Sequence, residues 1–186
     1  MTREQALELL HANMQNPNLR KHCYAVEAVM RALARKFGED EDIWGIAGLL
    51  HDADYEQTKE SPKDHTHTVI RWLKDHDLDP RINEAILAHG WGFVEGNEEP
   101  KNNMEWSLYT CDELTGFITA VALVKGRTFD NVDVQSILKK FPKKDFAAGV
   151  HRGQIKMCEE KLGIPLEEFV SIALEAMKGI RSELEL

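Results

Sequence analysis

Apolar residues recur along this chain with the spacing of an α-helix, almost from end to end. In the stretch PNLRKHCYAVEAVMRALARKF, residues 17–37, Val26, Val29 and Leu33 lie three and four positions apart and form one face. No stretch alternates strictly between apolar and polar residues as a half-buried strand does, and no internal repeat is present. The pattern therefore predicts an all-α fold.

Start and stop residues divide this pattern into separate helices. Thr2 and Asp79 are suited to cap a helix start, whereas Gly38 stands where glycine commonly ends one. Between such signals the sequence predicts longer helices over 3–13, 17–37, 40–52, 61–75, 79–89, 104–124, 150–162 and 165–183, and shorter ones over 133–140 and 143–149. Residues 91–103, WGFVEGNEEPKNN, have no periodicity and are predicted to form a loop.

Composition fits one soluble domain formed by residues 1–186. The chain is 42% hydrophobic and 30% charged, and no apolar segment reaches the roughly 20 uninterrupted residues of a membrane span. Charges interrupt the N-terminal MTREQALELL, which is not typical of a secretory signal, so we expect a cytoplasmic location and no membrane partner. Three cysteines without C-x-x-C spacing argue against a disulfide framework and a structural zinc site.

The net charge of −9 disfavours binding to a nucleic acid polymer, which needs a basic surface. A small anionic substrate is still compatible with this charge, because bound metal ions supply positive charge locally. The densest basic cluster is Lys139, Lys140, Lys143 and Lys144, which is either a solvated helix end or a phosphate contact. The sequence gives no indication of an oligomeric state.

Several histidines and carboxylates fall on the apolar faces of the predicted helices. His22 shares the face of Val26, Val29 and Leu33, whereas His51 and Asp52 directly follow the apolar run 46–50. The other three are His65, His89 and Asp112. His65 is in line with Val69 and Leu73, and His89 follows Ile82, Ala85 and Ile86. Asp112 lies one turn from Leu108, Tyr109, Thr115 and Gly116. If the helix over 61–75 turns a different face toward the core, His67 replaces His65 as the candidate metal ligand.

Each of these six residues alone has an ordinary explanation as a hydrogen-bonded core residue. Together, four imidazoles and two carboxylates are costly to bury unless they bind metal or form an extended polar network. Imidazole nitrogen and carboxylate oxygen without thiolate suit iron, manganese, cobalt or zinc in catalytic sites. Such a set is large enough to hold two ions roughly 3.5–4 Å apart.

The order H…HD…D, formed by His22, His51-Asp52 and Asp112, resembles the signature of the HD-domain superfamily of metal-dependent phosphohydrolases. The resemblance covers residues 18–124 and implies a bundle of about eight to nine helices, with C-terminal helices over 133–184 packed on this core. His65 and His89 complete the pattern H…HD…H…H…D of the dinuclear members. It implies that His22, His51, Asp52 and Asp112 hold one ion, and that Asp52, His65 and His89 hold the second, with Asp52 bridging.

The chain departs from the family where many members continue HD-x-x-K or HD-x-G-K. It reads HDADY, so Tyr55 replaces the lysine and Asp54 replaces a small residue. An assignment of the substrate from that lysine therefore does not carry over. The segment DELTGFITAVALVKGR resembles small bacterial HD proteins described as predicted hydrolases, which supplies no substrate.

The function implied by the resemblance is hydrolysis of a phosphoester, from a small phosphorylated substrate such as a nucleotide, by a metal-activated water. Asp52 and Asp112 are candidate proton acceptors, and Tyr55 is a candidate catalytic residue near the metals. Candidate substrate contacts are Lys125, Arg127, Lys139 and Trp91, with Trp91 and Phe93 able to stack on a base or simply to pack.

Two other functions share the same six residues. The ligand set also matches di-iron oxygenases built on the HD fold, for which activity would require reduced iron and dioxygen. A non-enzymatic protein that senses a nucleotide through a metal site is the remaining alternative.

Overall fold

A computed structural model describes residues 1–186 and contains helices but no strands, which confirms the predicted all-α fold. Eleven α-helices and one 3₁₀-helix follow one another along the chain. They are α1 (Arg3–Asn13), α2 (Pro17–Phe37), α3 (Glu41–Leu50), α4 (Tyr55–Thr58), η1 (Pro62–Asp64), α5 (His67–Leu73), α6 (Pro80–His89), α7 (Asn103–Val124), α8 (Val134–Lys140), α9 (Arg152–Lys161), α10 (Leu166–Gly179) and α11 (Arg181–Leu184).

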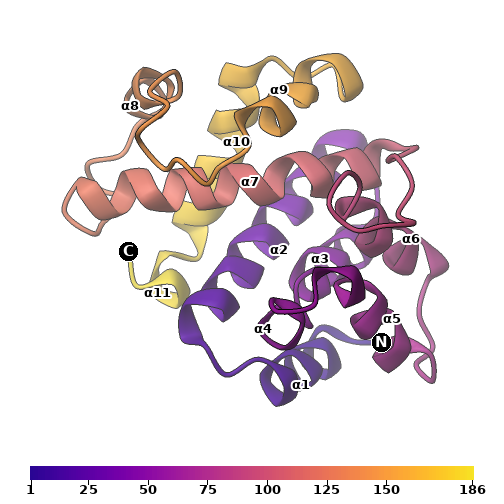
Figure 1. Ribbon diagram of the computed structural model, residues 1–186. Coiled ribbons are helices and arrows are strands. Elements are labelled where there is room, and N and C mark those ends of the chain that lie inside the picture. The colour runs from indigo at the N-terminus through magenta and orange to yellow at the C-terminus, as the bar shows by residue number, and fades with distance from the viewer.

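The long helix α7 crosses the middle of the molecule. In Figure 1 it runs between α1, α3, α4 and α5 below and α8 and α9 above, with α6 near its N-terminal end. It packs against α2, α6 and α9, and α2 in turn packs against α3 and α10. By length and composition α7 could cross a membrane, but 61% of its most apolar window is buried inside this bundle. Its apolar character is therefore accounted for by its central position in the core.

The helix boundaries follow the capping chemistry of the sequence. Thr2 and Gln5 form a reciprocal capping box at the start of α1, and the Asp79 carboxylate accepts the Arg81 backbone N–H at the start of α6. Gly38 ends α2 with φ = 70°, a conformation in which a residue with a Cβ is strained. These predicted starts and stops are confirmed.

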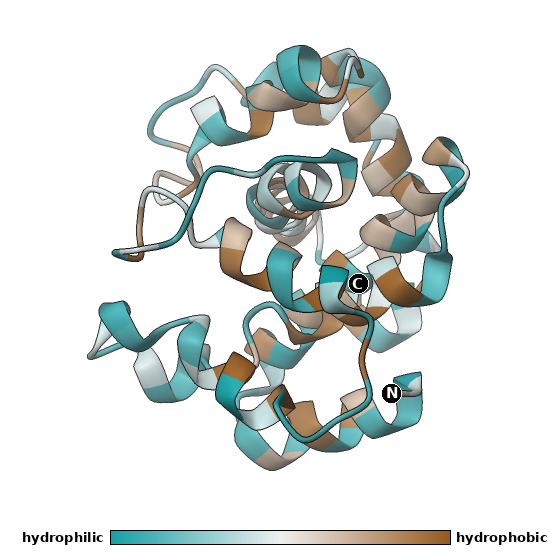
Figure 2. Ribbon diagram, turned by 90° about the vertical axis from the view of Figure 1, so that its right-hand side faces the viewer, coloured by the Kyte–Doolittle hydropathy of each residue, from teal (hydrophilic) through white to brown (hydrophobic).

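Burial of apolar side chains joins the first half of the chain to the second. One continuous core includes Leu10 of α1, Leu33 of α2, Phe117 of α7 and Phe169 of α10, all with no exposed surface. Figure 2 shows brown, hydrophobic and teal, hydrophilic segments alternating along the helices. The amphipathic pattern of the sequence thus corresponds to the packing of the helices around this core.

The predicted continuous helix over 61–75 is wrong. The chain forms a 3₁₀ turn at Pro62–Asp64, becomes extended at His65 (ψ = 147°) and turns through positive φ at Thr66 before α5 begins at His67. The interruption is coupled to tertiary contacts, because the buried Asp54 carboxylate accepts hydrogen bonds from the His65 ring and the Val69 backbone. Such contacts with distant residues override local helix propensity.

The predicted helix over 143–149 is also wrong, because this segment consists of turns. The Arg152 guanidinium donates hydrogen bonds to five backbone carbonyl groups, those of Phe141, Lys143, Phe146, Ala147 and Val150. One side chain therefore satisfies carbonyl groups that a helix would satisfy internally.

Three smaller features complete the comparison with the sequence. Residues 91–102 form no helix or strand, as predicted, and α7 begins one residue earlier than predicted, at Asn103. The short helix α4, which begins three residues after Asp52, was not predicted. The predicted helix over 165–183 is divided at Ile180 into α10 and α11.

Candidate metal centre

The HD dipeptide lies directly after the buried helix α3. Gly48 lets α3 approach α2 closely, since a Cβ there would lie 3.0 Å from the backbone of Glu27 and Val26. His51 is completely buried, whereas the Asp52 side chain keeps 14% of its surface exposed. The close packing of α3 on α2 therefore brings the HD dipeptide beside the inward face of α2, where His22 lies.

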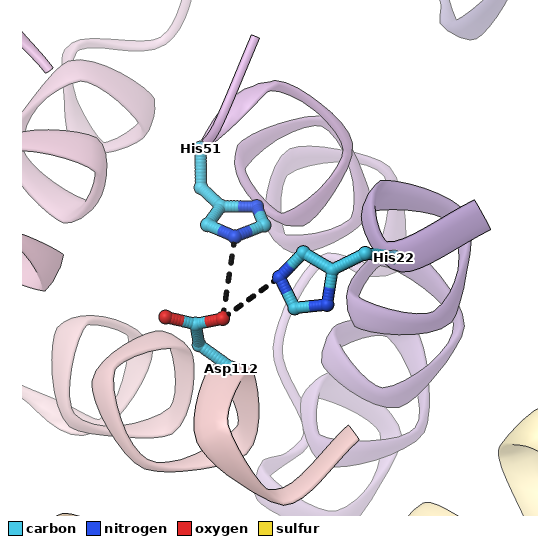
Figure 3. A group of neighbouring side chains, drawn as sticks. All are labelled: His22, His51 and Asp112. Carbon is cyan, nitrogen blue, oxygen red and sulfur yellow. Dashed lines mark ion pairs between the residues drawn. The ribbon is translucent and has the colours of Figure 1, made fainter. Parts of the chain in front are cut away.

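Three side chains from α2, the end of α3 and α7 converge on one point. Asp112 Oδ1 lies 2.9 Å from His22 Nε2 and 3.5 Å from His51 Nε2. Figure 3 shows both imidazoles pointing toward the Asp112 carboxylate from neighbouring helices. Ligating atoms of these three residues lie within 4.8 Å of one another, close enough to share one ion.

Asp52 connects this group to two further histidines. Its Oδ2 lies 3.6 Å from His51 Nε2 and 3.8 Å from His22 Nε2. Its other oxygen, Oδ1, lies 3.3 Å from His65 Nε2 and 3.4 Å from His89 Nε2. Each carboxylate oxygen of Asp52 thus faces a different pair of imidazoles, and His51, Asp52 and His89 form a second group that is compact enough for an ion.

Two of the histidines are oriented by backbone carbonyl groups of the helices that carry them. His51 Nδ1 lies 2.8 Å from the Gly48 carbonyl oxygen, and His89 Nδ1 lies 2.6 Å from that of Ile86. A carbonyl oxygen only accepts, so each ring donates its Nδ1–H there. The lone pair is left on Nε2, the atom that faces the centre.

The other two histidines are oriented by side chains with the same result. His65 Nδ1 lies 2.7 Å from Asp54 Oδ1, and His22 Nδ1 lies 3.4 Å from Thr115 Oγ1. The Thr115 hydroxyl itself donates to the Asp112 carbonyl, which leaves its oxygen free to accept from His22. With a metal ion at Nε2, each of the four rings would therefore donate its Nδ1–H to these partners, whereas without an ion His22 Nε2 donates to Asp112 Oδ1 at 2.9 Å.

The two carboxylates are stabilised in their charged form. Burial alone would raise the pKa of Asp52, but the charge of His51 and a hydrogen bond from His65 hold it well below the usual range. Burial likewise opposes ionisation of Asp112, and hydrogen bonding to His22 lowers its pKa below the ordinary value. The centre therefore holds two negative charges that require a compensating cation.

In the metal-free protein, protons supply that positive charge. Burial lowers the pKa of His51, but the charges of Asp52 and Asp112 outweigh it and raise the pKa to about 9. The pKa of His65 is raised to about 10, because hydrogen bonds to Asp52 and Asp54 outweigh the effect of burial. A divalent ion would replace these protons, since only the neutral imidazole is a ligand.

The residues fit a metal ion on independent geometric grounds. His51 Nε2 is buried and has no hydrogen-bond partner, which is costly for a polar atom unless an ion binds it. Its ring nitrogen and the surrounding carboxylate oxygens belong to the nitrogen and oxygen donor sets typical of catalytic transition-metal sites.

A cleft of about 360 Å³ opens onto this centre. Tyr55 and Lys59 of the α4 segment border it on one side, and the rings of Phe93 and His151, 5.2 Å apart, border it elsewhere. The remaining lining residues are Asp52, Thr58, Pro62, His65, His89, Gly90, Val94, Asp112, Glu113 and Gln154. The cleft therefore leads a small molecule directly to Asp52 and Asp112.

The structure brings together all six residues predicted to bind metal and places Tyr55 in the adjoining cleft. It does not bring Lys125, Arg127 or Lys139 to the centre. Lys125 follows Asp112 by thirteen residues of helix, about 20 Å, and its ammonium group contacts the Asn131 carbonyl. Arg127 lies just beyond it, and α8, with Lys139, lies at the same end of α7 in Figure 1.

Trp91 also does not line the cleft. Its ring packs against those of Trp106 and Tyr109, at centroid distances of 5.9 and 5.5 Å. Of the two aromatic residues after His89, Phe93 is the one at the cleft, and its side chain is 54% exposed. The packing interpretation of Trp91 is the one that agrees with the structure.

Sequence reasoning missed several residues of the cleft. His151, for which the sequence indicated no role, reaches it because α9 packs on α7, and its backbone N–H donates to the Glu113 carboxylate. Lys59 lies one helical turn after Tyr55 and lines the cleft. The only sequence signal for Asp54 was its unusual position inside HDADY.

Comparison with known proteins agrees with this geometry. A family model described as "HD domain" matches residues 19–115, which include all six residues of the centre. Ribonuclease Y of Helicobacter pylori strain J99 is 30% identical over 103 residues, or 53% of this chain and 18% of that protein. Ribonuclease Y of strain 26695 is 32% identical over 82 residues, or 44% of this chain and 15% of that protein. These matches span less than a fifth of the length of either relative. The family model covers more than half of the chain, so the protein belongs to the HD-domain family.

Proposed function

We propose that this protein is a metal-dependent phosphohydrolase that cleaves a small phosphoester and uses two divalent transition-metal ions, drawn from iron, manganese, cobalt and zinc. The observation that carries the proposal is the Asp52 carboxylate, which turns Oδ2 toward His22 and His51 and Oδ1 toward His65 and His89. This arrangement supports a carboxylate shared between two ions.

When bound, two such ions supply a Lewis acid for the phosphoryl oxygens and an acidified water for attack on phosphorus. The protein's own groups then have separate roles. Asp112, held in its charged form, would hold one of the ions together with His22 and His51, and its lowered pKa makes it a weak base. Lys59 lines the cleft and is suited to neutralise a phosphate oxygen. The Tyr55 hydroxyl and the His151 imidazole line the same cleft and are candidates to donate a proton to the leaving group.

The cleft and the charge of the chain support a small substrate. A volume of about 360 Å³ suits a molecule of nucleotide or sugar-phosphate size. The net charge of −9 opposes a long polyanion, although the name ribonuclease Y of the relatives makes an RNA phosphodiester the second candidate. We propose a cytoplasmic location for the same reaction.

The test begins with metal-free protein reloaded separately with Mn²⁺, Co²⁺, Zn²⁺ or, without oxygen, Fe²⁺. Each form is assayed against p-nitrophenyl phosphate, bis-p-nitrophenyl phosphate, mononucleotides, cyclic dinucleotides, sugar phosphates and a short RNA, beside an Asp52→Ala control. We expect metal-dependent phosphate ester cleavage that the control lacks.

Absence of cleavage with every ion would refute the hydrolase proposal. Oxygen consumption by the reduced iron form would instead support the oxygenase alternative, and nucleotide binding without turnover would support a sensor. Cleavage of RNA but not of the small esters would refute the proposed substrate class while leaving the hydrolase assignment in place.

A further inference from the structure

Thr66, the residue between His65 and α5, has an unusual backbone conformation. Its φ is 65° and its ψ is −45°, and it is completely buried. A β-branched residue rarely adopts positive φ, and strained backbone of this kind persists only where surrounding contacts impose it. The conformation is therefore held from outside the segment.

The contact that reaches Thr66 comes from the loop 91–102. The Asn97 amide nitrogen donates to Thr66 Oγ1 at 3.0 Å and to the Leu87 carbonyl of α6 at 2.7 Å. Both amide hydrogens are therefore used. Gly90 makes room for this arrangement, since a Cβ there would lie 2.4 Å from the Asn97 amide nitrogen and 3.2 Å from the Thr66 methyl group. One side chain thus joins the loop, the end of α6 and the segment that follows His65.

This junction lies beside only one half of the metal centre. His65 directly precedes Thr66, and His89 follows Leu87 by two residues, and both face Asp52 Oδ1. The other half, formed by His22, His51 and Asp112, is located on α2, α3 and α7, and Asn97 makes no hydrogen bond to it.

We infer that Asn97 is a positioning residue that keeps His65 available for the second ion, an inference that rests on the proposed two-ion function. The sequence of residues 61–75 favours an uninterrupted helix, in which His65 would not have the extended ψ of 147° that it has here. Asn97 holds Thr66 in the conformation that interrupts this helix. Without its donors the interruption keeps only the support of Asp54, and His65 is held less firmly in the geometry in which Nε2 faces Asp52.

The experiment titrates Mn²⁺ into metal-free protein by calorimetry and follows the coupled manganese pair by electron paramagnetic resonance. Asn97→Asp removes both donors in the same shape, and Asn97→Ala removes them without adding charge. Asn131→Asp, in an exposed loop at the other end of α7, is the matched control. Circular dichroism verifies that each variant is folded.

We expect two ions in the unmodified protein and in the control. In both Asn97 variants the second ion should bind at least about tenfold more weakly, with the first ion unchanged, as for other residues that orient metal ligands. Adding Thr66→Gly to Asn97→Asp should restore most of the second-ion affinity, because glycine adopts positive φ without strain.

Equal affinities for both ions in the Asn97 variants would overturn the inference and leave the two-ion proposal intact. A double variant no better than Asn97→Asp would also overturn it, because the role of Asn97 would then be general anchoring of the loop. Binding of a single Mn²⁺ by the unmodified protein would refute the two-ion proposal itself and this inference with it.

Discussion

Asp54→Asn is the most informative single change, because it alters a ligand's support without altering a ligand. The Asp54 carboxylate is fully buried and accepts two hydrogen bonds, at 2.7 Å from the His65 ring and at 3.0 Å from the Val69 backbone N–H. Asparagine offers one acceptor and one donor group. If its oxygen faces the Val69 N–H, its amide N–H faces His65 Nδ1. The ring then either keeps its Nδ1–H opposite another donor, or moves the proton to Nε2, the atom that faces the centre.

The expected loss of stability follows from these two bonds. A hydrogen bond to a charged group contributes about 1.5–3 kcal/mol, and a buried donor left without a partner costs about 1–3 kcal/mol. Relief of the buried negative charge offsets part of this. We expect the metal-free Asp54→Asn protein to be about 2–3 kcal/mol less stable, and its metal affinity to fall about 10–100-fold because His65 is no longer fixed in its tautomer.

The assay combines urea unfolding of the metal-free protein with metal titration at pH 7. Asp64→Asn is the matched control, since Asp64 lies in the same segment but its carboxylate accepts from Ser61 and makes no hydrogen bond to the His65 ring. That control should change stability by less than about 1 kcal/mol, as a partly exposed hydrogen bond does. An Asp54→Asn protein with metal affinity within twofold of the unmodified protein would refute the assignment of Asp54 as the residue that orients His65.

Three further predictions concern the centre and its cleft. Asp52→Ala should abolish the rise in melting temperature that metal causes. In the unmodified protein this rise corresponds to about 2.7 kcal/mol when metal is present at a hundred times its dissociation constant. Differential scanning calorimetry measures it, and an unchanged rise would contradict the shared role of Asp52. Because the pKa values of His51 and His65 are raised to about 9 and 10 from 6.5, their contribution to metal-free stability is fully present below pH 6.5 and is lost as pH rises through 9 to 10. Urea unfolding at pH 7 and 10 tests this loss of stability. Mn²⁺ affinity should rise with pH between 6 and 8.5, because fewer protons are displaced from the histidines. Stability and Mn²⁺ affinity that do not change with pH would contradict the raised pKa values. Trp91→Ala should lower the free energy of unfolding by about 2–4 kcal/mol through lost packing. Phe93→Ala should leave the free energy of unfolding within about 1 kcal/mol and change kcat/KM. Urea unfolding and steady-state kinetics measure these effects, and the reverse result would exchange the roles of the two residues.

Where helices are long and amphipathic, the sequence was sufficient to place the side chains. His22 and His89 fall on inward faces of regular helices, so helical periodicity correctly indicated the direction in which they point. The same reasoning failed for His65, which reaches the centre from an extended residue rather than from a helix. The buried Asp54 that orients it acts through a contact eleven residues away, which no local pattern encodes.

Contacts between distant segments explain what else could not be predicted. His151 borders the cleft only because α9 packs on α7, a consequence of side-chain packing over the whole bundle. Lys125 and Arg127 were predicted as substrate contacts because their charge could neutralise a phosphate, but α7 carries the chain about 20 Å from Asp112 before it reaches them. Charge alone therefore did not indicate which basic residues lie near the centre.

The turn segment held by Arg152 has a consequence for how the chain tolerates sequence change. Five carbonyl groups between Phe141 and Val150 accept hydrogen bonds from one guanidinium, so these bonds do not depend on the segment's own side chains. Residues 142–150 do not line the cleft, and of their side chains Phe146, Ala147 and Val150 pack against the core. The exposed positions of this segment are therefore free to vary as long as Arg152 and those three packing residues are kept, and Arg152 acts as the anchor of the backbone that leads to His151.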